Sequence, residues 1–343
     1  MAIPVGIAAL VELEVRTPSA IVVAIGTSIT GFVAFDAAAR TRFLWQAGVA
    51  PVMGFAGLLG ALTGGSAALA VPTMAAFSTI AAMSVAVSRR LTFAALNCVL
   101  ALLIAQGLAP EVHDPERVLI LVACGSLAQA ALSLIVALMQ GRLERPHAIA
   151  GAREAVAGVR ANLSLTSPSL RHALRSGGAL ALAVASYHVI DLAPHGYWVP
   201  LTVLFVLRAG RAETYERIGM RIAGTAAGLI VATGLAALAG ENIAANVAII
   251  VVSAASAYAM LAIEYALFTF GITIFIVTLS HGMGESAVDA AGERAIATAI
   301  GLAIVAIAFA VWRDREMALP GCQEPRHRPI AHAHRHGDEQ VAV

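Results

Sequence analysis

The sequence predicts an all-α, polytopic membrane protein with about twelve (eleven or twelve) transmembrane helices. Of its 343 residues, 59% are hydrophobic and 13% are charged, whereas soluble domains carry about 25% charged residues. The apolar runs are long, continuous and rich in Ala, Leu and Ile. Such runs favour helices, which satisfy their own backbone hydrogen bonds in lipid, over the alternating segments of a β-barrel.

The positions of the arginines predict the topology. All 22 basic residues are arginine, and 19 of them fall in every second gap between the apolar runs; only Arg16, Arg117 and Arg294 fall in the other gaps. Cationic loops remain on the cytoplasmic side during membrane insertion. The alternation therefore predicts a multi-pass membrane protein with both termini in the cytoplasm.

The apolar runs are expected to form helices near residues 3–14, 18–35, 44–62, 67–87, 92–108, 118–140, 174–192, 197–208, 219–239, 243–260, 265–281 and 294–312. A helix needs about 20 residues to cross the hydrocarbon core, so the first, second and eighth are short. Transporters often place their binding sites at short or broken helices. The apolar run 244–281 is too long for one span, and a turn is expected near Tyr258–Glu264.

The spans are expected to form two parallel six-helix repeats. Residues 1–140 are the first repeat, with a truncated first helix, and residues 174–312 are the second. Between them, residues 141–173 are a cytoplasmic linker with a surface helix, and residues 313–343 are a disordered cytoplasmic tail. Because each repeat has an even number of spans, both point the same way and enclose a path along the membrane normal.

The same spacing, Arg-x3-Thr-x2-Gly, opens two of the predicted spans. It comprises Arg221, Thr225 and Gly228 in one span, and Arg294, Thr298 and Gly301 in the other. Offsets of four and seven residues place all three side chains on one helix face. One interpretation is helix packing, with Gly allowing close approach, Thr bonding across the contact and Arg as an interfacial anchor. The other is an anion path, because a guanidinium recognises carboxylates through two parallel hydrogen bonds.

Four ionisable residues are candidates for proton coupling. Glu264 is the most membrane-embedded acid, and an ionisable group inside a span is a functional hypothesis; the alternative is an interfacial acid at a helix turn. His188, Asp191 and His195 are the other candidates, because they share one helical face if that helix continues and histidine titrates near neutral pH. The stretch from His195 to Thr202 is also consistent with an aromatic anchor, since Tyr and Trp favour the membrane interface.

Enzymatic and metal chemistry are not expected. The chain has no lysine, and hence no GxxxxGK phosphate loop, and it contains neither HExxH, nor GxSxG, nor paired Asp-rich motifs, so no enzyme activity and no cofactor are expected. Three histidines near the end of the chain, His332, His334 and His336, favour a cationic tail near anionic lipid over a metal site. The positive charge is divided among loops, which predicts no nucleic-acid partner.

Three motifs carry a family resemblance. They are Leu170-Arg171-His172-Ala173-Leu174-Arg175, then Gly196-Tyr197-Trp198-Val199-Pro200-Leu201-Thr202, and then Arg217 followed by Arg221-Ile222-Ala223-Gly224-Thr225-Ala226-Ala227-Gly228. This stretch resembles the fusaric acid resistance (FUSC) family, also called aromatic acid exporters, whose final helix is matched by Arg294, Thr298 and Gly301. The resemblance implies a permease of the bacterial inner (plasma) membrane for aromatic or other organic acids.

The expected function is proton-driven export of organic acids. Arginines at the cytoplasmic mouth, including Arg175 and Arg217, would collect small organic anions, and the two Arg-Thr pairs would line the substrate path. Two alternatives remain open: an organic-anion channel of the same fold, and a non-transporting membrane partner subunit. The expected partners are small organic anions, protons and membrane lipid. Whether the chain also forms a homo-oligomer or binds a periplasmic adaptor is left open.

Overall fold

The computed structural model describes residues 26–311, apart from positions 28, 35–36, 110–113, 142–151, 191, 193–194 and 262. Over these residues the secondary structure is helical and contains no strand, which confirms the all-α class. Several expectations lie outside the described residues: the helix near 3–14, most of the helix near 18–35, Asp191, and the tail with His332, His334 and His336.

In the first half of the chain, the helices lie close to their predicted bounds. They are α3 (Ala39–Thr63), α4 (Ala67–Ala82), the 3-10 helix η1 (Met83–Ala86), α5 (Arg89–Gly107) and α6 (Pro115–Met139). The Ser88 hydroxyl accepts a hydrogen bond from the Leu91 N–H at 3.2 Å and so caps α5. A further short helix, α7 (Ala152–Ala161), lies within the predicted linker.

The described part of the second half contains six helices. They are α8 (Pro168–Ile190), α9 (Trp198–Val206), α10 (Arg211–Ala239), α11 (Ile243–Met260), α12 (Tyr265–Gly282) and α13 (Ala287–Val311). The chain turns between α11 and α12 at residues 261–264, where the sequence predicts a turn. Helix α10 begins at Arg211 rather than near residue 219, because its first turns are polar but helical; Arg217 and Glu213 lie one turn apart there, 3.7 Å from each other.

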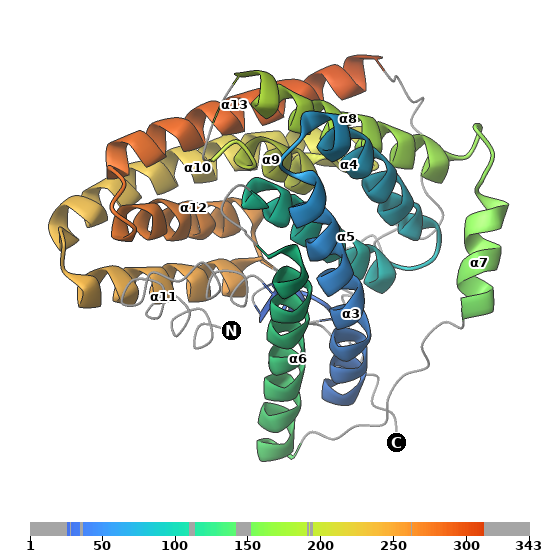
Figure 1. The fold of residues 1–343 in the computed structure, drawn as a ribbon, viewed down its shortest axis with the longest axis horizontal. Helices are drawn as coiled ribbons and strands as arrows, with labels where there is room; N and C mark the ends of the chain where they lie inside the picture. Colours follow the sequence, from blue (N-terminus) through green and yellow to red (C-terminus); the bar gives the residue numbers. More distant parts are fainter. Residues whose placement is uncertain are drawn as a thin grey trace, which may run out of the picture.

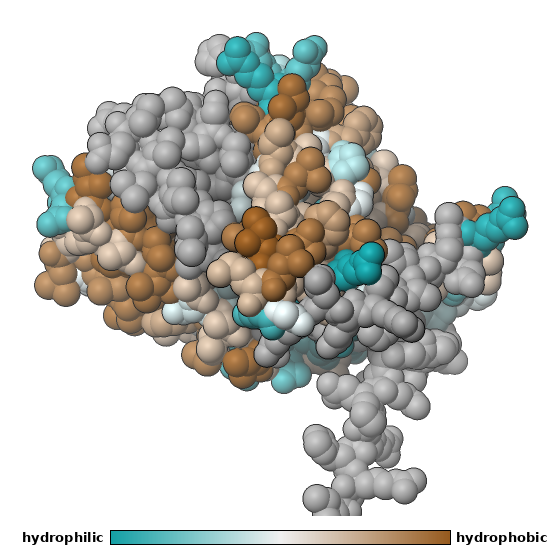
Figure 2. Space-filling model, turned by 90° about the horizontal axis from the view of Figure 1, so that it is seen from below, coloured by the Kyte–Doolittle hydropathy of each residue, from teal (hydrophilic) through white to brown (hydrophobic). Residues whose placement is uncertain are grey.

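Nine helices in the described part of the chain are long and apolar enough to cross a membrane: α3, α4 with η1, α5, α6, α8, α10, α11, α12 and α13. Large apolar side chains on them are exposed, including Ile80 (73%), Ile230 (76%) and Leu238 (86%). Figure 2 shows apolar residues over much of one face of the molecule. Water-soluble proteins rarely expose apolar surface on this scale, so lipid covers it and the chain is a multi-pass membrane protein.

The helices pack in two groups that meet at α4, α8 and α9. Helix α3 packs against α5 and α6, whereas α12 packs against α10 and α11. Contacts of α4 with α8 and of α9 with α13 connect the groups. In Figure 1, α3 and α6 run in one direction, while α10, α11 and α12 run in another. The twelve-helix arrangement as two parallel repeats remains a prediction.

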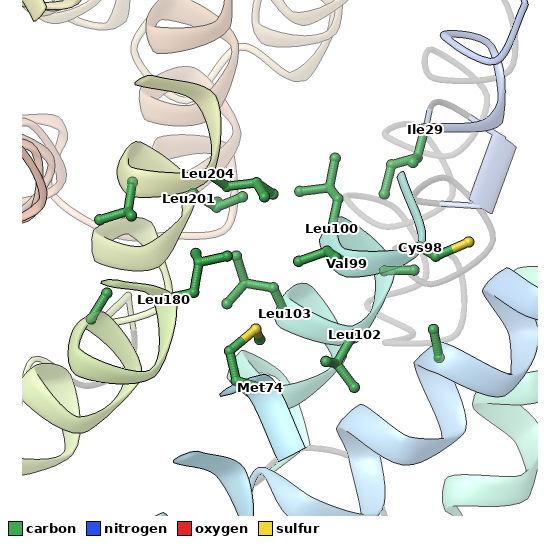
Figure 3. Close-up of a cluster of buried hydrophobic side chains, with 14 of the residues drawn as sticks. Ile29, Met74, Cys98, Val99, Leu100, Leu102, Leu103, Leu180, Leu201 and Leu204 are labelled. Carbon is green, nitrogen blue, oxygen red and sulfur yellow. The ribbon is translucent and has the colours of Figure 1, made fainter. Parts of the chain in front are cut away.

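The largest core cluster lies where α5 meets α8 and α9. Its residues include Leu100, Leu102 and Leu103 of α5, none more than 5% exposed. Figure 3 shows these side chains beside Leu180 of α8 and Leu204 of α9. Within a bilayer, helices associate through close packing and interhelical hydrogen bonds rather than through release from water. The cluster therefore holds α9 in place between the two groups.

Candidate functional site

Helix α9 is almost completely enclosed. Eight of its nine residues are buried: Trp198, Val199, Pro200, Leu201, Thr202, Val203, Leu204 and Val206. A helix that is apolar on all sides belongs in an interior, and Pro200 lies in the first turn, where backbone N–H groups have no helical partner. The burial of Trp198, which is 1% exposed, argues against a simple aromatic anchor at the membrane interface. Trp198 and Thr202, one turn apart, are the polar side chains of this helix.

Arg221 of α10 and Arg294 of α13 converge on these two side chains. Arg221 is 1% exposed, and its Nη2 donates to the Thr202 hydroxyl at 3.3 Å. Arg294 is 2% exposed, and its guanidinium carbon lies 5.3 Å from the centroid of the Trp198 ring. Thr202 in turn donates to the Trp198 carbonyl at 3.1 Å. The structure thus brings together the two arginines that the sequence predicts in the substrate path.

No described acidic side chain forms an ion pair with Arg221 or Arg294. The ion pairs among the described residues all involve other side chains. Arg221 Nε and two nitrogens of Arg294, Nε and Nη1, are buried without a hydrogen-bond partner. The hydroxyls of Thr225 and Thr298, one turn further along the same helices, are also buried and unpartnered. A buried charge is normally paired, because leaving it unpaired costs several kcal/mol. These donors are therefore chemically suited to an anion such as a carboxylate.

A titratable pair lies beside the same indole ring. The His195 ring stacks on Trp198 with centroids 4.2 Å apart and an interplanar angle of 17°. Its Nδ1 lies 2.8 Å from Glu293 Oε2 and 3.7 Å from Glu285 Oε1. Glu293 directly precedes Arg294 in α13. One ring, Trp198, therefore contacts both the histidine of this pair and a buried arginine.

Three ligand atoms from His195, Glu285 and Glu293 lie within 4.8 Å of one another, which is the kind of set that can hold a metal ion. The sequence predicts no metal, and the 2.8 Å contact between His195 and Glu293 gives both residues a partner without one. All three side chains are partly exposed, at 15%, 25% and 35% in the order His195, Glu285, Glu293. Protons from solution can therefore reach the group.

The predicted helical face of His188, Asp191 and His195 depends on α8 continuing, and α8 ends at Ile190. The chain then turns towards α9, and Gly196 packs so closely on Tyr187 that a Cβ at position 196 would lie 2.8 Å from the Tyr187 Cβ. His188 remains in the last turn of α8, stacked on the Tyr187 ring at 4.5 Å. His195 instead joins the acids described above.

Glu264 lies at the N-cap of α12, in the turn between α11 and α12, and is partly buried. Its carboxylate accepts a hydrogen bond from the Ala266 N–H at 3.5 Å. An acid at a helix N-terminus is stabilised by the helix dipole and by the free N–H groups. This geometry corresponds to the alternative of an acid at a helix turn, while a coupling role for Glu264 remains a prediction.

Two further predicted arginines lie near the turn between α9 and α10. Arg175 of α8 donates to the carbonyls of Arg208 and Ala209 at 3.3 and 3.0 Å and lies 4.1 Å from the Phe309 ring centroid. Through these contacts, Arg175 stabilises the turn between α9 and α10. Arg217 lies over the Tyr265 ring at 4.5 Å and is partly exposed.

Glu213 lies between Arg208 and Arg217. Its carboxylate is 3.6 Å from Arg208 Nε and 3.7 Å from Arg217 Nε, so one acid forms ion pairs with two guanidinium groups. Burial, together with the neighbouring Arg217, lowers the pKa of Arg208 to about 10, and Glu213 partly opposes this shift. Arg208 is therefore still protonated at neutral pH. This turn carries an excess of positive charge.

Sequence reasoning did not identify Glu285, Glu293 or Arg208 as site residues. The two acids lie about one hundred residues from His195, and no local pattern connects them. A weak signal was present, because Glu293 adjoins Arg294 at the start of an apolar run. The Trp198 and Thr202 contacts likewise depend on α10 and α13 meeting α9.

Residues 179–308 match the family model described as "Fusaric acid resistance protein-like". The chain is 31% identical to "Inner membrane protein YccS" of Escherichia coli (strain K12) over 150 residues, which cover 43% of this chain and 20% of that protein. It is 32% identical to "Uncharacterized protein ORF2" of Neisseria gonorrhoeae over 158 residues, covering 46% and 37%.

It is also 31% identical to "Uncharacterized protein slr1298" of Synechocystis over 160 residues, covering 45% and 20%. These matches span about a fifth to just over a third of the relatives' length. No solved structure matches. The resemblance is confirmed for residues 179–308 of this multi-pass inner membrane protein, which are similar to fusaric acid resistance proteins.

Proposed function

We propose that the chain acts, alone or as part of a longer protein, as a secondary transporter that exports aromatic or other organic acids from the cytoplasm. The proposal includes two parallel six-helix repeats, both termini in the cytoplasm, and coupling to the proton gradient. The family described for residues 179–308 supports the choice of organic acids.

A single observation carries the proposal: two buried arginines contact α9, and three of their guanidinium nitrogens have no hydrogen-bond partner among the described residues. A structural ion pair would have placed an acid beside each guanidinium. Here the complement of Arg221 and Arg294 is a transported anion. A guanidinium is permanently charged and binds a carboxylate through two parallel hydrogen bonds. The unpartnered hydroxyls of Thr225 and Thr298 add neutral donors.

Proton coupling is assigned here to His195 with Glu293 and Glu285. The pair is partly exposed, so it can exchange protons with solution. Because Trp198 contacts both His195 and Arg294, protonation beside this ring alters the surroundings of the buried arginine. Glu264 is the rival coupling group.

Two other functions compete with a carrier. An organic-anion channel would use the same arginines, and a non-transporting partner subunit would use them only for packing. A carrier saturates with substrate and responds to a pH gradient, whereas the current through a channel follows the membrane voltage.

The proposal is tested with the purified full chain in proteoliposomes under separately imposed pH and voltage gradients. Labelled organic acids, including benzoate and propionate, serve as probes. The expected result is saturable, pH-driven flux that Arg221→Gln reduces at least about tenfold. Voltage-driven, non-saturating flux would identify a channel. If parental and Arg221→Gln proteins give the same flux as empty liposomes for every acid, the transporter proposal is wrong.

A further inference from the structure

The threonine hydroxyls of the helices fall into two groups. A threonine inside a helix can donate to the carbonyl four residues earlier. Six described threonines form this bond: Thr63, Thr79, Thr92, Thr202, Thr214 and Thr233. Five others do not, and their hydroxyls are buried without a hydrogen-bond partner among the described residues: Thr225, Thr269, Thr273, Thr278 and Thr298. All five lie on α10, α12 and α13, so the unpartnered hydroxyls are confined to one part of the fold.

Three of the unpartnered hydroxyls on α12 form one stripe. Thr269 and Thr273 lie four residues apart and Tyr265 lies four residues before them, so all three share a face of the helix. Each is at most 6% exposed, and the Tyr265 hydroxyl is likewise buried without a described partner. At 1.5 Å per residue, this α12 hydroxyl stripe is about 12 Å long.

The α12 hydroxyl stripe faces α10. A Cβ at Gly224 of α10 would lie 2.9 Å from the Thr269 Cβ. A Cβ at Gly228, one turn further on, would lie 2.8 Å from the Thr273 Cβ. The two helices therefore run in the same direction and approach closely along the stripe. Close packing explains small side chains here, but valine has the shape of threonine and would bury no unpaired hydroxyl, which is destabilising.

Arginines of α10 lie along the same interface. Arg217 lies over the Tyr265 ring at 4.5 Å and is partly exposed, on the predicted cytoplasmic side. Arg221 and Thr225 follow at intervals of four residues, which places them on the same face of α10 as Arg217. The Arg221 Nε is buried without a described partner. Helices α10 and α12 thus place polar groups in a row, from a partly exposed arginine to a buried one and on to neutral hydroxyls.

We propose that the α12 hydroxyl stripe is the second wall of the transport path, and that its threonines receive the anion from Arg221. The inference rests on the proposed export function for the movement of an anion. A path binds an ion well enough to replace its water and weakly enough to release it, and neutral hydroxyls meet both conditions better than a further guanidinium. Thr269 and Thr273 are 0% exposed, so the path is closed in this structure and opens when α10 and α12 separate.

Two substitutions at Thr273 separate its hydroxyl from its methyl group. Thr273→Val removes the hydroxyl and keeps the shape. It is expected to lower organic-anion flux in proteoliposomes about three- to tenfold, the scale of one neutral hydrogen bond, with an unfolding temperature at or above the parental one. Thr273→Ser keeps the hydroxyl and should retain near-parental flux at a lower unfolding temperature. The inference is overturned if flux follows the unfolding temperature in both variants.

The matched control for the loss of a hydroxyl is Thr233→Val on α10. Thr233 donates to the Leu229 carbonyl at 2.8 Å, so its hydroxyl already has a partner. This variant should leave flux unchanged. A loss of flux equal to that of Thr273→Val would show that any threonine of these helices has the same effect, and would contradict the role given to the stripe.

A second measurement does not depend on flux. In a cysteine-free background, Thr273→Cys is expected to react with a negatively charged methanethiosulfonate reagent at least about tenfold faster than Ile274→Cys, because arginines along a path concentrate anions. Ile274 is the neighbouring position, is only 5% exposed and lies off the stripe. Equally slow reaction at both positions overturns the inference, whatever the flux. Fast reaction at position 273 in a protein that transports no acid would retain the water-accessible path and overturn the export function instead.

Discussion

The Arg-x3-Thr-x2-Gly spacing allows two interpretations, helix packing and an anion path, and the structure supports a different one for the glycines than for Arg221 and Arg294. The glycines serve packing: a Cβ at Gly228 would lie 2.8 Å from the Thr273 Cβ, and one at Gly301 would lie 2.7 Å from the Thr202 Cβ. The arginines do not resemble interfacial anchors, since both are at most 2% exposed and their donors are not saturated. One motif thus holds helices together with its glycine and presents a charge with its arginine.

Substitution of the buried arginines tests the charge. Arg221→Gln is expected to reduce organic-anion flux at least about tenfold, since a hydrogen bond to a charged group is worth about 1.5–3 kcal/mol. Arg221→Lys should restore only part of it, because lysine lacks the planar fork. Arg294→Gln should have a smaller effect, because Arg294 faces the exit side in the predicted topology.

Flux in proteoliposomes is the measurement, with Arg160→Gln as control because Arg160 is exposed on α7. Protein abundance should stay near the parental level in all variants. If Arg221→Gln and Arg221→Lys both transport at the parental rate, Arg221 does not bind the anion and serves only in helix packing.

The coupling group is tested by comparing two carboxylates. Gln keeps the shape and hydrogen bonding of Glu but cannot release a proton. Glu293→Gln is expected to abolish pH-driven flux and to leave exchange across a membrane without a gradient, because His195 loses its charged partner at 2.8 Å. Glu264→Gln should retain gradient-driven flux, since that carboxylate caps α12. The reverse result for the two variants would move coupling to Glu264.

Helix α9 is shorter than a membrane span but is buried among the longer helices. Its nine residues cannot cross a bilayer, but they lie between α8, α10 and α13, and both Arg221 and Arg294 contact them. Close approach of the surrounding helices depends on small residues, as is usual in membranes. Helix α10, which carries Arg221, packs on α12 through Gly224 and Gly228.

Two glycines of α10 allow a matched test of this packing. Gly228→Ala is expected to destabilise the protein by about 1–3 kcal/mol, because the added methyl group meets Thr273 and the Phe270 carbonyl. A Cβ at Gly234 meets nothing within 4 Å, so Gly234→Ala should be neutral or stabilise the helix by roughly 0.5–1 kcal/mol. Thermal unfolding of the detergent-solubilised chain measures both. Equal unfolding temperatures would contradict the role given to Gly228.

For the whole molecule, the arginine alternation predicts which loops face the cytoplasm. In a cysteine-free background, a cysteine at Leu165 should be shielded from a membrane-impermeant thiol reagent in intact cells. A cysteine at Val288 should be labelled. Both positions are well exposed, at 74% and 66%, so burial does not explain a difference. Labelling at position 165 would contradict the predicted topology.

Helix positions and class follow from the sequence because they depend on local quantities. Apolar runs bounded by arginines and turn residues predict the bounds of α4 to α6, α11 and α12 closely, whereas α10 and α13 begin earlier, at Arg211 and Ala287, because their first turns are polar. The turn at 261–264 follows from the length limit of one span. The shared Arg-x3-Thr-x2-Gly pattern identifies Arg221 and Arg294 as matched residues, but it does not predict that both contact α9.

The partners of these residues required the tertiary structure. His195 meets Glu293 across 98 positions of sequence, Arg221 meets Thr202 across 19, and neither separation corresponds to a helical repeat. The end of α8 at Ile190 redirects His195 away from the face it would share with His188. Periodicity reports which residues share a face of one helix. Which other helix that face meets is decided by packing between elements, so the contacts of Arg221 and Arg294 with α9 follow only from the tertiary structure.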